Sequence, residues 1–320
     1  MTVTGAASGI GRATALRFAE EGASVVVADV ADDAGDETVA MIADAGGQAV
    51  YQHSDVSSDE DVARLVTTAR ETFGGLDVAV TNAGILGHFM PAADIPVEEF
   101  DRIMAINVGG VFLGIKHQLP AIVDRGGGAI VNVASAAGYL GQPFAAAYTP
   151  SKHAVLGLTK AAALDHAQSG VRINSVCPGG VATNFAAHLD LSGTADAPDP
   201  HPIGRSADSA ELAAAILWLA SDEASFAVGA NVPIDGGLKR PQARFVIMER
   251  PVPDLIEVAE LPQRCARAGE AVVEAGQHVR TRAGEQRRSA SVGPRHLAHL
   301  RRHAGDPDRG GDGRDHLGQR

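Results

Sequence analysis

Thr4-Gly5-Ala6-Ala7-Ser8-Gly9-Ile10-Gly11 joins a short apolar run to the amphipathic segment Ile10–Glu20. Glycines between a strand and a helix permit a tight turn, and they let a pyrophosphate approach the backbone over a helix N-terminus that favours anions. The spacing G-x-x-x-G-x-G differs from the G-x-G-x-x-G of other dinucleotide folds, and a lone glycine cluster can also be an ordinary loop. The strand–turn–helix context favours cofactor binding. The predicted binding residues are Gly5, Ser8, Gly9, Ile10 and Gly11.

Apolar runs and amphipathic segments alternate over the first 238 residues. Near-continuous apolar strands between helices imply a parallel sheet that is covered on both faces. Right-handed crossovers then give an open, doubly wound sheet of the Rossmann type, whose ligands bind beyond the carboxyl ends of the strands. We therefore predict an α/β fold with one domain over residues 1–238, flanked by helices on both faces. The predicted strands are Ser24–Ala28, Asp77–Val80, Ala129–Val133, Val171–Val176 and Asn231–Ile234, and the predicted helices are Ile10–Glu20, Ala34–Ala45, Asp59–Thr72, Val97–Gln118, Ser151–Gln168 and Ser209–Ala220.

The first strand of this pattern is short. Only Met1-Thr2-Val3 precede the glycine turn, whereas a strand usually has about five or six residues. Two explanations fit this pattern equally well. Either the true start lies further upstream, or the first strand is simply short.

The composition provides ample material for a buried core, since 45% of the 320 residues are hydrophobic. Cys177 and Cys265 give no disulfide framework, and neither has metal-ligand spacing. No stretch approaches the ~20 apolar residues of a membrane span, and no signal peptide precedes the glycine motif. We expect a cytoplasmic protein without a metal site or a membrane partner.

Charge divides the chain into two parts. Residues 1–238 carry a net charge of −17, which argues against nucleic acid as a partner, whereas residues 239–320 carry +5. The second part holds 15 Arg but only one lysine, Lys239, and from about Arg280 it has too little apolar material to offset chain entropy. We predict a disordered C-terminal extension. Its arginine bias favours a shifted reading frame past the natural end, with a nucleic-acid-binding tail as the alternative.

Asp29 closes the apolar run Val25–Ala28. An acidic side chain at the end of the second strand can bind the hydroxyls of the adenosine ribose, and it repels the additional phosphate of NADP. Val30 follows, so no cation stands beside Asp29 to bind that phosphate, and Arg12 is the one residue that could weaken the preference. The sequence favours NAD, although a strand-end aspartate can also be simply solvated.

Two further segments belong to the same edge of the expected sheet. Asp55-Val56 follows the third strand, where a carboxylate can accept a hydrogen bond from the adenine amino group. Asn82-Ala83-Gly84 follows the fourth strand, where small residues let the backbone approach the adenosine. Each segment is also a plausible turn signal when it is taken alone.

Tyr148 and Lys152 stand four residues apart. This spacing places a phenol and an ammonium group on one face of a helix, about 6 Å apart at Cβ. A nearby cation favours the phenolate, so the tyrosine could exchange a proton near neutral pH. Most Tyr-x-x-x-Lys pairs are ordinary solvated helix faces. The pair gains its meaning from Ser135, thirteen residues upstream, and from the cofactor motifs.

Together these residues resemble the short-chain dehydrogenase/reductase family over about residues 1–238. The motifs occur in the family's order: Thr4-Gly5-x-x-x-Gly9-x-Gly11, Asp55, Asn82-Ala83-Gly84, Asn107, Ser135, Tyr148-x-x-x-Lys152 and Pro178-Gly179-x-x-x-Thr183. Asp235-Gly236-Gly237 looks like the end of the family's last strand. The short first strand and the C-terminal extension depart from the family pattern.

The resemblance implies a catalytic tetrad. Tyr148 would be the general acid/base, and Lys152 would lower its pKa and hold the nicotinamide ribose. Ser135 would hydrogen-bond the substrate oxygen, a role that strengthens as charge develops there. Asn107 would position a water that links Lys152 to solvent. The residues expected to contact the cofactor are then Tyr148 and Lys152 together with the segment that flanks the nicotinamide, Pro178, Gly179, Val181 and Thr183.

Three segments are expected to set substrate specificity: Ile85–Met90, Gly138–Ala145 with Tyr139, and the loop Asn184–Pro202. They are largely apolar and contain no Arg or Lys, which disfavours a phosphorylated substrate. We expect NAD-dependent interconversion of a secondary alcohol and a ketone. The alternatives are a non-catalytic dinucleotide-binding protein, an NADP-dependent ketoreductase of the same fold, and a poorly folded product of this reading frame. The resemblance also implies a homodimer or homotetramer, because the family's counterpart of helix Ser151–Gln168 commonly packs against its twin.

Overall fold

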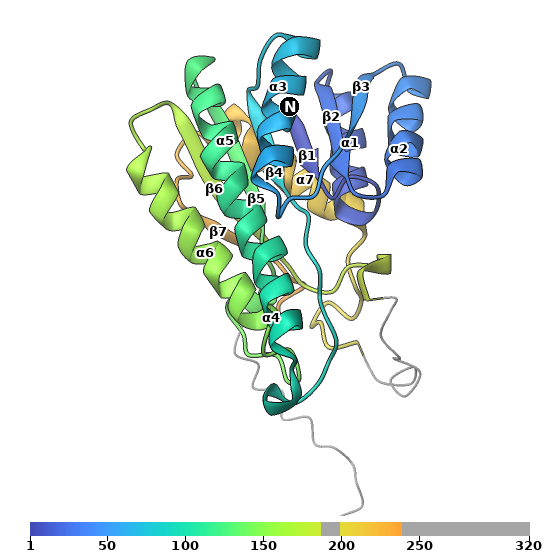
Figure 1. Ribbon diagram of the computed structural model, residues 1–320, viewed down its shortest axis with the longest axis vertical. Coiled ribbons are helices and arrows are strands. Elements are labelled where there is room, and N and C mark those ends of the chain that lie inside the picture. Colours follow the sequence, from blue (N-terminus) through green and yellow to red (C-terminus); the bar gives the residue numbers. More distant parts are fainter. Residues whose placement is uncertain (187–198, 239–320) are drawn as a thin grey trace, which may run out of the picture. The chain divides into compact units, whose positions relative to one another are not determined.

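The computed structural model describes residues 1–186 and 199–238 (Figure 1). The predictions for residues 239–320, including their disorder and the shifted reading frame, lie outside the described residues. So does most of the loop Asn184–Pro202.

Seven parallel strands form one sheet in the order β3-β2-β1-β4-β5-β6-β7. The strand order reverses between β1 and β4, and ligands of such sheets bind at this point, beyond the carboxyl ends of the strands. The predicted doubly wound α/β fold is confirmed. The strands are β1 (Thr2–Thr4), β2 (Ser24–Asp29), β3 (Gln48–His53), β4 (Val78–Thr81), β5 (Gly128–Val133), β6 (Val171–Pro178) and β7 (Asn231–Ile234).

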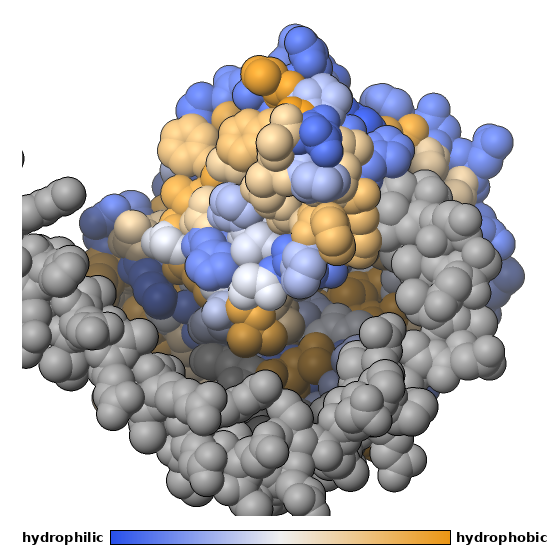
Figure 2. All heavy atoms as spheres, turned by 90° about the horizontal axis from the view of Figure 1, so that it is seen from below, coloured by the Kyte–Doolittle hydropathy of each residue, from blue (hydrophilic) through white to orange (hydrophobic). Residues whose placement is uncertain are grey.

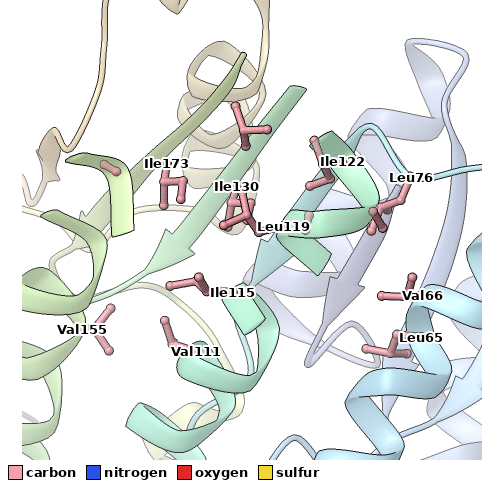
Figure 3. Packing of buried hydrophobic residues seen from close by; sticks show 14 of the residues in the cluster. Leu65, Val66, Leu76, Val111, Ile115, Leu119, Ile122, Ile130, Val155 and Ile173 are labelled. Atoms are coloured by element: carbon pink, nitrogen blue, oxygen red, sulfur yellow. The ribbon is translucent and has the colours of Figure 1, made fainter. Parts of the chain in front are cut away.

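Helices cover both faces of the sheet (Figure 1). One face packs against α1 (Gly9–Glu20), α2 (Asp32–Asp44) and α7 (Ser209–Ala220), whose apolar residues share a core with Val25, Val27 and Val131. The other face packs against α3 (Asp59–Phe73), α5 (Gly110–Asp124) and α6 (Tyr148–Asp165). Figure 3 shows this second core, where side chains of the three helices meet Ile130 of β5 and Ile173 of β6.

Strand β1 is short but fully integrated. Its three buried residues pair with β2 on one side, and Thr2 and Val3 also pair with β4 on the other. The glycine turn that follows is therefore anchored between two neighbouring strands.

The prediction of one continuous helix over Val97–Gln118 is wrong. The segment consists of α4 (Val97–Met104), a π-helical turn (Ala105–Gly109) and α5, which continues to Asp124. The wider turn changes which side chains face inward, and it places Asn107 in the fully buried interior. Such π-helical turns are frequent at functional sites.

Short 3₁₀ turns complete the described structure: η1 (Ala92–Asp94), η3 (Ala136–Gly138), η4 (Asn184–Ala186) and η6 (Asp222–Ala224). Helix α6 begins at Tyr148, three residues before its predicted start, so the i, i+4 geometry of Tyr148 and Lys152 is that of a regular helix. Among residues 1–186 and 199–238, no helix combines the length and hydrophobicity that a membrane crossing requires.

Candidate active site

The predicted site residues gather at the carboxyl edge of the sheet. The glycine turn follows β1, Asp29 ends β2, and Asn82–Gly84, Ser135 and Gly179–Thr183 follow β4, β5 and β6. This edge lies at the bottom of Figure 1. Figure 2 views the molecule from that end, where hydrophobic and hydrophilic residues lie side by side on the described surface.

The glycine turn is held in a tight shape by Asn82. Its amide nitrogen donates hydrogen bonds to the carbonyl oxygens of Thr4 at 2.9 Å and Gly5 at 3.1 Å. A Cβ atom on Gly5 would lie 2.8 Å from that nitrogen, and one on Gly11 would lie 2.0 Å from the Gly5 oxygen. Only glycine fits at these two positions. The glycine turn therefore presents backbone atoms that no Cβ atom covers at Gly5 and Gly11.

The start of α1 suits an anion. Ser8 has an extended backbone, and its side chain makes no capping bond to the described residues of the first turn. The amide groups of that turn therefore remain available to a phosphate group, which the helix dipole also favours. A Cβ atom on Gly9 would lie 3.2 Å from the Thr183 methyl group, so the turn after β6 reaches the same place. Ile10 is the second residue of the helix.

Asp29 stands directly beside the glycine turn. Its carboxylate accepts hydrogen bonds from the amide groups of Ala7 at 2.9 Å, Val30 at 2.8 Å and Ala31 at 3.1 Å. These bonds fix the carboxylate at the end of β2, where a ribose would lie in the predicted cofactor pose. The backbone, rather than a cation, fixes its position.

Arg12 is engaged elsewhere. Its guanidinium group donates to the Glu37 carboxylate at 2.7 Å, to the Ala34 carbonyl at 3.1 Å and to the Thr38 hydroxyl at 3.0 Å. These partners belong to α2. The one cation that the sequence offered to an additional phosphate is thereby used to join α1 to α2.

Asp55 and Val56 have different environments. Asp55 is exposed, and one of its carboxylate oxygens accepts hydrogen bonds from the Ser57 amide and hydroxyl groups. The Val56 side chain is buried, and a Cβ atom on Gly110 would lie 2.8 Å from it. Val56 can therefore face a cofactor only through its main chain.

Tyr148, Lys152 and Ser135 come together as the sequence predicts. Tyr148 is 7% exposed and Lys152 is 4% exposed, with the ammonium nitrogen 5.7 Å from the centre of the phenol ring. That nitrogen donates to the Val133 carbonyl at 3.1 Å, which leaves further N–H groups for another ligand. The Ser135 hydroxyl accepts from the Ala137 amide at 3.1 Å and is hydrogen-bonded to the phenol.

Burial dominates the pKa of the Tyr148 phenol and opposes the lowering expected from Lys152. Burial raises the pKa of the phenol to about 12, and the hydrogen bond with Ser135 only partly opposes this. Burial also lowers the pKa of Lys152 to about 8. Both shifts have the same cause, because a dry environment disfavours phenolate and ammonium alike.

Asn107 connects the loop after β4 to the start of α6. Its amide group donates to the Ile85 carbonyl at 2.9 Å and to the Ser151 hydroxyl at 3.0 Å, and its oxygen accepts from the Ile85 amide at 2.8 Å. Gly84 lies against this group, since a Cβ atom there would lie 3.1 Å from the Asn107 oxygen and 3.5 Å from the Lys152 nitrogen. Sequence reasoning missed Ser151, although a serine three residues after Tyr148 belongs to the same helix face.

An apolar wall surrounds the phenol. Leu86, Ala137 and Ala145 form a buried cluster with Tyr148, and the centre of the Phe185 ring lies 6.1 Å from that of the tyrosine. Leu86, Ala145 and Phe185 come from the three segments that were predicted to bind the substrate, whereas Ala137 lies just before the second of them.

The prediction that Tyr139 lines the substrate site is wrong. Its hydroxyl donates to the Asn231 carbonyl at 2.7 Å, and its ring packs against the core on the α6 face of the sheet. Tyr139 therefore fixes η3 to the edge strand β7. The alternation of small and large residues in Gly138–Ala145 gave no signal of this inward orientation.

A cavity of about 610 Å³ lies beside the turn after β6. The described residues that line it include Gly180, His201, Arg205, Glu211 and Asp235, but none of Ser135, Tyr148 and Lys152. We therefore locate the chemistry by the side chains that can perform it and not by this cavity. Within the described ranges, no three His, Cys, Asp or Glu side chains are grouped so that they could hold a metal ion.

A family model described as enoyl-(acyl carrier protein) reductase matches residues 5–239. The chain belongs to the short-chain dehydrogenase/reductase family. Dehydrogenases of this family use nicotinamide dinucleotide cofactors. The match covers all the motifs at the carboxyl edge of the sheet.

Several curated members of the family are similar over nearly their whole length. The chain is 44% identical over 239 residues to a 2,5-dichloro-2,5-cyclohexadiene-1,4-diol dehydrogenase of Sphingobium indicum, covering 73% of this chain and 94% of that protein. It is 42% identical over 234 residues to a cyclohexanol dehydrogenase of Acinetobacter, with 73% and 92% covered. It is 45% identical over 235 residues to a cis-4-hydroxycyclohexanecarboxylate dehydrogenase of Sinomonas cyclohexanicum, with 73% and 94% covered. These short-chain dehydrogenases support an oxidoreductase that acts on CH–OH groups.

Solved structures agree with this assignment. Levodione reductase matches with a TM-score of 0.73 at 34% identity, covering 75% of this chain and 97% of that one. A short-chain dehydrogenase/reductase from Mycobacterium marinum matches with a TM-score of 0.71 at 38% identity, with 75% and 95% covered.

Proposed function

We propose that this protein oxidises an alicyclic secondary alcohol to the ketone, with NAD as the hydride acceptor and Tyr148 as the acid/base residue. The observation that carries the proposal is the buried group of Tyr148, Lys152 and Ser135 at the edge of the sheet where the glycine turn opens. A module that only binds a dinucleotide has no use for these three side chains together.

The residues present fit a nicotinamide dinucleotide. The bare glycine turn and the start of α1 would hold the pyrophosphate, Asp29 the adenosine ribose, and Lys152 the nicotinamide ribose. Asp55 and Val56 would face the adenine, and the turn from Pro178 to Thr183 would lie along the nicotinamide. When it is bound, the oxidised nicotinamide supplies the hydride acceptor and a positive charge near the phenol.

NAD is favoured over NADP by two observations. The Asp29 carboxylate is fixed by backbone amides at the end of β2, beside the glycine turn, where its charge would repel the additional phosphate of NADP. Arg12, the cation that could have offset this charge, is hydrogen-bonded to α2. An NADP-dependent ketoreductase of the same fold is therefore the less favoured candidate.

Tyr148 would accept the proton of the substrate hydroxyl group and return it in the reverse reaction. During oxidation its phenolate oxygen takes the alcohol proton while the C–H bond releases its hydrogen as a hydride; during reduction the phenol returns a proton to the alkoxide. Ser135 would donate a hydrogen bond to the same substrate oxygen. With a pKa of about 12, the Tyr148 phenol is protonated near neutral pH. Nearby positive charge must therefore favour its ionisation before oxidation begins.

Asn107 would act indirectly, by holding together two segments next to Tyr148 and Lys152. Its amide group joins Ile85 to the first turn of α6, next to both Tyr148 and Lys152. The water relay toward Lys152 that the family resemblance implies stays a prediction.

The apolar residues around the Tyr148 phenol indicate the class of substrate. Leu86, Ala137, Ala145 and Phe185 offer apolar surface around the reacting oxygen, which suits a compact hydrocarbon ring with one hydroxyl group. Dehydrogenases of cyclohexanol and related ring alcohols are among the similar proteins. The same wall offers no cation to a phosphorylated substrate.

A panel of alcohols tests this function. Purified protein is incubated with NAD or NADP and with cyclohexanol, substituted cyclohexanols, linear secondary alcohols or a sugar phosphate, and the absorbance of the reduced cofactor is followed. The proposal predicts activity with ring alcohols and NAD, less with linear alcohols, and none with the sugar phosphate. Cofactor binding without reduction by any alcohol would indicate a binding protein instead.

We also propose a homodimer or homotetramer. Helix α6 leaves Leu164 74% exposed in the single chain, and such a side chain commonly marks an interface when it lies on a helix with other exposed apolar residues. Analytical ultracentrifugation tests this, and a monomer at all concentrations would refute it.

A further inference from the structure

His201 is a buried histidine that the proposed chemistry does not use. It is 5% exposed, and it lies in the segment between η4 and α7. Its Nε2 atom accepts a hydrogen bond from the Gly180 amide at 2.7 Å, and its Nδ1 atom lies 2.5 Å from the Asp199 carboxylate. Because an amide N–H can only donate, Nε2 must carry a lone pair. The proton is then on Nδ1, which donates it to Asp199.

Asp199 holds the histidine in this tautomer. The oxygen that faces Nδ1 also accepts from the His201 amide at 2.8 Å, and the second oxygen lies 3.4 Å from the Ser206 hydroxyl. The bonds from His201 keep the pKa of this carboxyl below its usual range. Arg205, the neighbour of Ser206, pairs with Glu211 in the first turn of α7, which fixes the segment to that helix.

The imidazole ring lies directly against the turn after β6. A Cβ atom on Gly180 would lie 2.6 Å from the ring carbon Cε1, and one on Gly179 would lie 2.8 Å from Nε2. Side chains at these two positions would displace the histidine. The glycines therefore let the ring approach the backbone, which is the contact that the hydrogen bond to Gly180 requires.

Backbone hydrogen bonds also support the turn, among them one from the Ala182 amide to the Ala207 carbonyl at 2.9 Å. The Gly179 amide donates to the Ile234 carbonyl at 3.0 Å, and the Gly180 carbonyl accepts from the Ala207 amide at 2.9 Å. Without His201, the half-buried Gly180 N–H would lose this hydrogen bond. The same turn continues to Thr183, whose methyl group would be 3.2 Å from a Cβ atom on Gly9 in the glycine turn.

We propose that His201 is a positioning residue that fixes the turn from Pro178 to Thr183 at the distance from the glycine turn that cofactor binding requires. Asp199 selects the tautomer, Nε2 holds the Gly180 amide, and the turn then stands ready before the cofactor arrives. The inference rests on the proposed function, because it assigns this turn to the nicotinamide. A turn that is fixed in advance loses less entropy on binding, so His201 would contribute to affinity without touching the cofactor.

Three variants separate this role from simple packing. His201→Leu fills the space but removes the acceptor. His201→Gln retains an oxygen acceptor near the position of Nε2 and loses the bond to Asp199. Asp199→Ala retains the ring but removes the group that selects its tautomer. His166→Leu, at the C-terminal end of α6 and so at the opposite edge of the sheet, is the matched control.

Two readouts are measured on the full chain. The first is the dissociation constant of NADH, from its fluorescence on titration. The second is the hydrogen–deuterium exchange of the peptide that contains Gly180, without any cofactor. We expect His201→Leu to weaken NADH binding and to speed exchange at Gly180, each by about tenfold, since the hydrogen bond between Gly180 and His201 is lost. His201→Gln should stay within about threefold of the wild type, and Asp199→Ala should fall between them.

The outcomes are distinct. Equal NADH binding and equal exchange in His201→Leu and wild type would overturn the proposal, and so would a Gln variant as weak as the Leu variant. If His201→Leu does not fold, Asp199→Ala and His201→Gln decide: the proposal requires the Ala variant to bind NADH more weakly than the Gln variant. If the wild type itself binds no NADH, the proposed function fails, whereas the exchange experiment still tests whether His201 fixes the turn.

Discussion

The two halves of the carboxyl edge of the sheet are held by different kinds of contact. In the cofactor half, around the glycine turn and Asp29, the contacts are made by the backbone: three amides hold the carboxylate, and Asn82 holds two carbonyl oxygens. In the proposed catalytic half, the contacts are made by buried side chains: the Lys152 ammonium lies 5.7 Å from the centre of the Tyr148 ring, and Asn107 donates to Ser151 of the same helix. In the first half, backbone contacts fix the shape of the binding surface. In the second half, burial controls the ionisation of Tyr148 and Lys152. Substitutions in the first should change affinity, and those in the second should change rate or pH dependence.

Replacing the acid/base residue should have the largest effect. Tyr148→Phe removes the proton-carrying oxygen and little else, so we expect kcat to fall by about 10³-fold while the dissociation constant of NADH stays within about twofold. Steady-state rates with the best alcohol of the panel measure this. Tyr139→Phe is the matched control, because its hydroxyl is hydrogen-bonded to the Asn231 carbonyl and lies 3.7 Å from the Cys177 sulfur, and it should retain nearly full kcat. Equal losses in both variants would remove the distinction between the two halves.

The charge state of Lys152 should appear in the stability of the protein. Its pKa is about 8 in the folded protein and 10.5 ordinarily, so between these values the unfolded chain binds a proton that the folded protein does not. The free energy of unfolding therefore rises with pH across this window, by at most roughly 3 kcal/mol, and the contribution is lost as pH falls toward 8. The phenol of Tyr148 acts in the opposite sense, but only above pH 10.

Lys152→Met lacks this titration. Denaturant unfolding of both proteins at about pH 8 and about pH 10 should show the wild type gaining stability relative to the variant. A difference that is independent of pH would show that burial does not control this ammonium group, and would contradict the physical account of the catalytic half.

Loss of the Asn107 side chain should have a smaller effect, which should appear both in the free energy of unfolding and in kcat. Asn107→Ala leaves the Ile85 amide and carbonyl without partners, which should lower the free energy of unfolding by about 1–3 kcal/mol. Because Ile85 and Ser151 adjoin the reacting residues, kcat should fall as well. Asn174→Ala, which loses bonds to Ala227 and Ala230 near β7, should lose similar stability and keep its kcat. If both variants kept kcat, Asn107 would be structural only.

Removing the charge of Asp29 should have the smallest effect and should change selectivity. Asp29→Asn retains one acceptor oxygen, which can serve Val30 and Ala31, and loses the second acceptor, which Ala7 uses. Because the variant no longer repels a phosphate, the ratio of the NADP to the NAD dissociation constant should fall by about tenfold. Asp32→Asn is the control, since that nearby carboxylate is bound to Tyr51 and His53. A ratio that is unchanged in Asp29→Asn would contradict the assignment of this half.

The sequence predicted the two halves of the carboxyl edge to different degrees. In the proposed cofactor half, the glycine turn, Asp29 and the strand–helix alternation indicated which residues would gather, but not the bonds from Asn82 to Thr4 and Gly5. In the catalytic half, the motifs predicted that Tyr148, Lys152 and Ser135 would meet. The π-helical turn at Asn107 was missed because hydrophobic periodicity does not reveal one extra residue in a helical turn.

Contacts between distant segments were also beyond the sequence. Ser151 as the partner of Asn107, Tyr139 turned toward β7, and His201 against Gly180 all depend on tertiary placement. The effect of burial on the pKa of Tyr148 was missed for a related reason. The spacing of Tyr148 and Lys152 shows that a cation is near, but not how completely both groups are buried.

The central claim is that this edge of the sheet transfers a hydride from a carbinol carbon to a nicotinamide under the control of Tyr148. The most direct measurement uses the best alcohol of the panel, with deuterium on that carbon, in a single turnover with NAD-saturated wild type and with NAD-saturated Tyr148→Phe. Mass spectrometry then follows the label. The account predicts that the wild type forms reduced cofactor carrying the deuterium, and that the variant, with its cofactor fully bound, forms almost none in the same time. Reduced cofactor without the label, or equal labelling by both proteins, would contradict it.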